Sequence, residues 1–166
     1  AHSKGLKLVV FGVDYDLAPD FPMPAGHESA YSASMWLIEH AADFGVDPNK
    51  FAIYGESGGA LIAAGVGNLL AENNTSHHIK LNIAHGVAGG DTWSVPEDQL
   101  QSQYERAVRQ RQGTLIWWLT GELGDCANEP PVHLKDRTDI CPAKISDELA
   151  AKCPPTVIVT SEYDFC

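Results

Sequence analysis

The sequence predicts a single α/β domain with a mostly parallel central sheet flanked by helices. Two nearly continuous apolar and β-branched runs, residues 6–15 and residues 156–160, are typical of strands buried on both faces of a parallel sheet. Between them, residues 28–44 place apolar side chains at spacings of three and four, which indicates an amphipathic crossover helix. Strands that alternate with helices along the chain are the pattern of parallel βαβ units.

The elements of the first half follow one another closely after the strand at residues 6–15. An ordered loop comes first, because the three prolines of residues 17–26 disfavour a helix there. The crossover helix that follows ends at Gly45. Residues 51–54 then form a short apolar strand, and the glycine-rich turn at residues 55–59 leads into a helix of small residues ending at about residue 72. The order is strand, helix, strand, tight turn and helix.

The second half begins with a further strand, predicted within residues 81–87. Ser94 and the glutamate three residues later form a capping box, which predicts a helix through about Gln112. The polar, loop-rich residues 121–153 are longer than the connections usual in a compact domain. We therefore expect one partial domain over residues 1–166, with a cap or an excursion on the substrate side around residues 90–150.

Composition and charge exclude several classes of partner. A formal net charge of -11 opposes binding to phosphate backbones, so no nucleic acid partner is expected. The apolar runs are far shorter than the roughly 20 residues that cross a bilayer, so no membrane-spanning segment is expected. No clustered ligands or cofactor motifs occur, so we expect neither a metal nor a cofactor. The oligomeric state and the compartment are left open, with the cytoplasm slightly favoured.

Four cysteines lie in the last third of the chain, at spacings that match no tight pair of metal ligands. They are Cys126, Cys141, Cys153 and Cys166. Free thiols are one interpretation, and a disulfide such as one between Cys126 and Cys141 is the other. The sequence leaves both open.

The turn at residues 55–59 reads Gly-Glu-Ser-Gly-Gly and matches the pattern G-x-S-x-G. In this pattern a serine lies on a sharp turn between a strand and a helix, and the neighbouring glycines relieve crowding. Ser57 is therefore the candidate nucleophile, and the backbone N–H of Gly58 is the candidate donor to an oxyanion. A phosphate-binding turn is the alternative, but the segment lacks the Gly-Lys-Ser/Thr of a P-loop.

A nucleophilic serine needs a histidine that takes its proton and a carboxylate that orients the histidine. Asp164 follows the strand at residues 156–160, so it leaves the sheet at the carboxyl edge from which the Ser57 turn also emerges. We take Asp164 as the triad acid, with Glu162 as a weaker candidate and a turn-capping role as the alternative. Trp117 and Trp118 are candidates for binding an acyl or aromatic group, although buried tryptophans more often belong to a core.

The base histidine is expected to be missing from this chain. Where a G-x-S-x-G turn between a strand and a helix carries the nucleophile, the histidine follows the acid in sequence. Here only Phe165 and Cys166 follow Asp164. The seven histidines of the chain all precede it: His2, His27, His40, His77, His78, His85 and His133. None of them is assigned to catalysis.

Several stretches resemble the hormone-sensitive-lipase-like esterases of the α/β-hydrolase fold, in the order of that family. They include VDYDLAP at residues 13–19, FPMPA at residues 21–25, the turn at residues 55–59 and PPTVIVTSEYD at residues 154–164. Two positions depart from the family pattern. Asp16 stands where the family usually has arginine, and Gly58 stands where alanine is commoner.

The resemblance implies a carboxylic ester hydrolase that acts on a small-molecule ester through an acyl-enzyme on Ser57. It also implies a second oxyanion loop before Ala1 and a histidine beyond Cys166, so we expect the chain to be truncated at both ends. A strand between residues 6–15 and the strand that carries Ser57 would be missing too, leaving a gap in the sheet. Two alternatives stay open: a non-catalytic, ligand-binding or receptor-like member of the fold, and an amidase, peptidase or acyltransferase with the same triad.

Overall fold

The computed structural model describes residues 8–18, 20–86, 134 and 136–159 of the 166-residue chain. These residues form a three-stranded parallel sheet with the strand order β1-β2-β3. The strands are β1 (Phe51–Glu56), β2 (Ile79–His85) and β3 (Thr156–Val159). The α-helices are α2 (Ala25–Glu39), α3 (Gly58–Glu72) and α5 (Asp147–Ala150), and the short 3-10 helices are η1 (Ala41–Phe44), η2 (Ser76–His78) and η4 (Pro142–Lys144).

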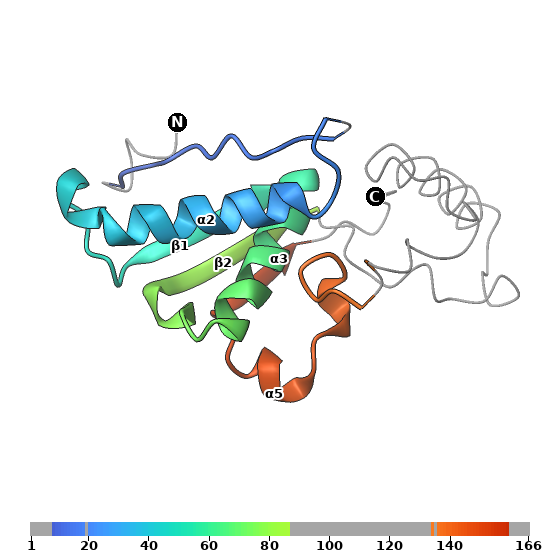
Figure 1. The fold of residues 1–166 in the computed structure, drawn as a ribbon. Coiled ribbons are helices and arrows are strands. Elements are labelled where there is room, and N and C mark those ends of the chain that lie inside the picture. Colours follow the sequence, from blue (N-terminus) through green and yellow to red (C-terminus); the bar gives the residue numbers. More distant parts are fainter. Residues whose placement is uncertain (1–7, 19, 87–133, 135, 160–166) are drawn as a thin grey trace, which may run out of the picture.

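Helix α3 packs on β1 and β2, and α2 packs on α3 (Figure 1). Small residues make this close packing possible, since a Cβ atom on Gly67 would lie 2.7 Å from the side-chain nitrogen of Asn82 on β2. The main core joins Ile38 of α2, Leu70 of α3 and Ile79 of β2, all of them buried. The predicted order of strands and helices over residues 25–86 is thus confirmed. The single helix predicted over residues 28–44 is instead α2 followed by η1, and Gly45 ends η1 with a φ of 67°.

The strand predicted at residues 6–15 is not formed in the described part, so that prediction was wrong for residues 8–15. Residues 8–18 belong to no helix or strand, and most of their apolar side chains are exposed, with Val9 at 55% and Val10 at 60%. The composition suits a buried strand, but a strand also needs a neighbour for its backbone hydrogen bonds. Among the described residues, no strand is placed to complete this pairing.

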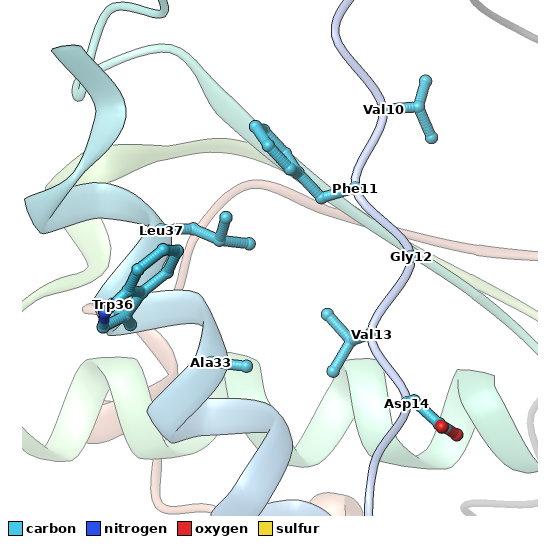
Figure 2. Close-up of a pocket in the computed structure, with 8 residues that line it drawn as sticks. All are labelled: Val10, Phe11, Gly12, Val13, Asp14, Ala33, Trp36 and Leu37. Atoms are coloured by element: carbon cyan, nitrogen blue, oxygen red, sulfur yellow. The ribbon is translucent and has the colours of Figure 1, made fainter. Parts of the chain in front are cut away.

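An open pocket of about 520 Å³ separates residues 10–14 from α2. Phe11 and Val13 point toward Leu37 and Ala33 of α2, while Val10 points away from the helix (Figure 2). Trp36 also lines this pocket and is half exposed. Ser57 is not among the lining residues, so this pocket is separate from the predicted nucleophile.

Part of the region expected to form a cap packs against the helices. Leu134, Ile140 and Cys141 form a second buried cluster with Met23. The Nδ2 atom of Asn68, on α3, donates to the carbonyl oxygen of Thr138 at 2.8 Å and to that of Pro142 at 3.5 Å. We call residues 136–142 the docked segment; Figure 1 shows it in orange beside α3. Residues 90–133 lie outside the described residues, and so do Cys126 and Cys166. Cys141 is buried, and Cys153 is a free thiol.

Replacing Asn68 by alanine is expected to lower the free energy of unfolding by about 1–2 kcal/mol, because two backbone carbonyls of the docked segment lose their donor. Asn73→Ala is the matched control, since its exposed side chain donates to the Leu69 carbonyl at the end of α3 and not to the docked segment. This change should cost less than about 0.5 kcal/mol. Urea unfolding measures both, and equal losses would show that Asn68 does not hold the segment.

Candidate active site

Ser57 occupies the sharp turn that joins β1 to α3. Its φ of 55° and ψ of -122° are unusual for a residue with a side chain, as expected for a strained turn that presents a nucleophile. Backbone hydrogen bonds of Ser57 hold the turn in place. The Ser57 N–H donates to the His85 carbonyl at 2.9 Å, and the Ser57 carbonyl accepts from the Ala60 N–H at 2.9 Å. Ser57 is exposed, so its hydroxyl is open to a substrate.

The glycines of the turn differ in what they contribute. A Cβ atom on Gly55 would overlap the carbonyl group of Gly59 and lie 2.8 Å from the Ala60 nitrogen. Cβ atoms on Gly58 and Gly59 would meet nothing within 4 Å. Packing therefore requires glycine only at the first of these three positions. The pattern in the sequence does not reveal this difference.

Gly58 is the first residue of α3 and is exposed. The first N–H groups of a helix have no partner within the helix, and they carry the positive end of the helix dipole. The backbone N–H of Gly58 thus lies directly after the nucleophile, at the end of the helix that favours negative charge. This position fits the predicted role as a donor to an oxyanion.

Two polar residues that the sequence analysis did not single out lie beside Ser57, at the carboxyl edge of the sheet. Glu56 and His85 are register partners at the ends of β1 and β2, and both are exposed. The Tyr54 hydroxyl donates to Glu56 Oε2 at 3.4 Å, on the same face of β1. The register between two strands brings Glu56 and His85 together, and one sequence does not reveal that register.

Asp164, Trp117 and Trp118 lie outside the described residues, so their roles remain predictions. The end of β3 shows where the chain leaves the sheet before it reaches Asp164. Val159 pairs with His85, and its carbonyl accepts from the Gly86 N–H at 2.7 Å. The chain therefore leaves β3 at the same edge as the Ser57 turn, five residues before Asp164 in the sequence.

Among the described residues, no group of three or more His, Cys, Asp or Glu side chains is placed to hold a metal ion. No helix in the same part of the chain is long and apolar enough to cross a membrane.

Comparison with known proteins places this turn and sheet in a family. The sequence profile of the α/β hydrolase fold matches residues 1–166. The carboxylesterase NlhH of Mycobacterium tuberculosis is 44% identical over 64 residues, which are 39% of this chain and 20% of that protein. An arylesterase of Saccharolobus solfataricus is 29% identical over 167 residues, which cover 98% of this chain and 49% of the arylesterase. The chain thus spans at most about half the length of these relatives.

Solved structures agree in fold. The carboxyl esterase 2 of Tuber melanosporum superposes with a TM-score of 0.65 at 24% identity, over 90% of this chain and 46% of that chain. A thermostable esterase of Pseudomonas putida superposes with a TM-score of 0.63 at 22% identity, over 91% of this chain and 44% of that chain. The family predicted from the sequence motifs is confirmed: the chain belongs to the α/β hydrolase fold family.

Proposed function

We propose that this protein is a carboxylic ester hydrolase in which Ser57 is the nucleophile. The observation that carries the proposal is the geometry of residue 57: a serine at positive φ, exposed, directly after a parallel strand and before a helix. Relatives named as esterases, one of them matched over 98% of this chain, support the same reaction class.

The reaction begins when the Ser57 Oγ attacks the carbonyl carbon of the ester while a histidine takes the hydroxyl proton. The carbonyl oxygen becomes an oxyanion, which accepts a hydrogen bond from the Gly58 N–H. The histidine then gives its proton to the leaving alcohol, and an acyl group stays on Ser57. Water attacks this acyl-enzyme with the histidine as base, which releases the acid and restores the serine.

Asp164 is proposed to orient that histidine, since it follows β3 in sequence and β3 ends at the edge where Ser57 lies. No histidine of this chain follows Asp164, so we propose that the base is not among these 166 residues. We propose Trp117 and Trp118 as part of the pocket for the acyl or aromatic group of the substrate, because large apolar side chains commonly line such pockets.

The test compares p-nitrophenyl butyrate hydrolysis by two proteins. One is the 166-residue chain, for which we expect no turnover that depends on Ser57, because an unactivated serine hydroxyl is a poor nucleophile. The other is a chimera in which this chain replaces the matched half of the Saccharolobus solfataricus arylesterase, which supplies the rest of the fold. We expect the chimera to hydrolyse the ester.

Each contrary outcome has a definite meaning. A chimera that folds, as judged by circular dichroism, but does not turn over would favour a non-catalytic, ligand-binding member of the fold. Turnover of amides or acyl transfer in preference to ester hydrolysis would favour an amidase, a peptidase or an acyltransferase. Ser57-dependent hydrolysis by the chain alone would disprove the missing base. His85→Asn would then be examined first, because the carbonyl of His85 accepts a hydrogen bond from the Ser57 N–H.

A further inference from the structure

His27 is a buried histidine without a hydrogen-bond partner among the described residues. It lies in the first turn of α2 with 0% of its surface exposed, and neither Nδ1 nor Nε2 has a partner within the described part of the chain. Buried polar atoms in proteins are almost always paired, because an unpaired one loses its hydration without compensation. The esterase mechanism proposed above does not use this side chain.

Three elements meet at His27. A Cβ atom on Gly65 of α3 would lie 2.6 Å from His27 Cδ2, and it would overlap the carbonyl oxygen of Asp139 in the docked segment. The imidazole, the middle of α3 and the docked segment therefore pack against one another with no room for a side chain at position 65. His27 is part of the contact that joins this segment to the two helices.

The charged groups around the imidazole come from α2 and from the docked segment. Glu28 follows His27 on α2, and the segment contributes Arg137 and Asp139. Arg137 donates to Asp139 at 2.7 and 2.9 Å and to Glu28 at 3.1 Å. Hydrogen bonds to Asp139 hold the pKa of the Arg137 guanidinium above its ordinary value, so this cation persists at all relevant pH values. The residue of α3 at this contact, Gly65, carries no charge.

The pKa of His27 is lowered from 6.5 to about 4, and burial is the largest cause. The Asp139 and Glu28 carboxylates raise the pKa of His27, whereas the Arg137 cation lowers it further. Protonation would place an unsolvated imidazolium beside a guanidinium.

We propose that His27 is a pH-sensitive switch, whose protonation releases the docked segment from α2 and α3. The docked segment is the element that can move most easily. To α3 it is attached by the Asn68 hydrogen bonds and by the Thr138 hydroxyl, which donates to Glu72 Oε1. One ion pair to an exposed Glu28 and a small apolar cluster complete its described contacts, whereas α2 and α3 share the main core. Its release exposes the imidazole to water without unfolding the sheet. The inference does not depend on the proposed esterase activity.

The direction of the pH dependence follows from the two pKa values of His27. With the segment released, the imidazole regains a pKa of 6.5, so the released state binds more protons than the docked state between pH 6.5 and about 4. The docked state is therefore fully favoured above pH 6.5, and this advantage is lost as the pH falls toward 4. The equilibrium constant for release should rise about 20-fold between pH 7 and pH 5. Below pH 4 it should level off at about 300 times its value well above pH 6.5.

Hydrogen–deuterium exchange at pH 7, 6 and 5, corrected for the intrinsic pH dependence of exchange, tests this switch on the full chain. Carboxyl groups ordinarily titrate around pH 4, so this range favours histidines over carboxyl groups, and the His27→Leu variant separates His27 from the other histidines. We expect exchange in peptides of the docked segment to rise about 20-fold from pH 7 to pH 5 beyond the intrinsic change, while peptides of β1 keep their protection. His27→Leu should abolish this rise, and the exposed His77→Gln should leave it intact.

A second measurement covers the case in which His27→Leu does not fold. In the unmodified chain, NMR titration of the histidine ring protons should show one imidazole that stays neutral down to about pH 4 while the segment is docked. The proposal is overturned if exchange of the segment does not depend on pH or if β1 loses protection together with it. It is equally overturned if folded His27→Leu keeps the pH dependence, or if every histidine titrates near 6.5 with the segment docked.

Discussion

Replacing Ser57 by alanine in the chimera is expected to lower kcat for p-nitrophenyl butyrate by about 10⁶-fold, because the residue that forms the acyl-enzyme is lost. The fold should survive, since Ser57 is exposed and its backbone, not its hydroxyl, makes the bonds that hold the turn. Asp164→Asn should lower kcat by about 10⁴-fold, because an amide does not hold the histidine in the required tautomer. Steady-state kinetics with circular dichroism of each variant measures these effects.

Ser32→Ala is the matched control for Ser57→Ala. Ser32 is an exposed serine of α2, and its hydroxyl donates to the Glu28 carbonyl one turn earlier in the same helix. Its removal should change kcat by less than about twofold. A Ser57→Ala chimera that keeps most of its activity would show that the hydrolysis arises elsewhere, and the assignment of the nucleophile would be withdrawn.

Replacing Gly55 by alanine is expected to destabilise the chain by at least about 3 kcal/mol, at the upper end of what overpacking costs. The new methyl group would overlap the carbonyl of Gly59 and press on the Ala60 nitrogen, both of them backbone atoms of α3. A side chain could rotate away, but here relief requires moving the start of α3 off the end of β1. Urea unfolding followed by circular dichroism measures the loss, and activity of the chimera should fall with it.

Gly58→Ala makes the same chemical change three residues later and serves as the control. A Cβ atom at this position meets nothing within 4 Å, and the residue begins α3. Alanine has a higher helix propensity than glycine, so we expect no loss and a gain of up to about 0.5–1 kcal/mol. The hormone-sensitive-lipase-like pattern, which commonly has alanine here, agrees with that expectation. Equal losses at both positions would show that the packing at Gly55 is not what limits the turn.

The sequence was sufficient to place the candidate nucleophile and to give the order of elements around it. Residues 51–72 form a strand, a turn and a helix as predicted, because apolar runs, glycines and small helical residues determine local structure through contacts close in sequence. The same local reasoning was wrong for residues 8–15. Their composition is that of a buried strand, but a strand forms only where another strand completes its hydrogen bonds.

What the sequence by itself determined is the family, the chain order of the elements, and Ser57 with its neighbouring N–H as the candidate reactive groups. Only the tertiary structure decided which distant residues meet. His85 accepts a hydrogen bond from the backbone of Ser57, and His27 packs against Gly65 and Asp139. The physical reason is that periodicity and turn chemistry act between residues a few positions apart. Strand register and the packing of α2 and the docked segment on α3 join residues up to about 110 positions apart, through contacts that no local pattern encodes.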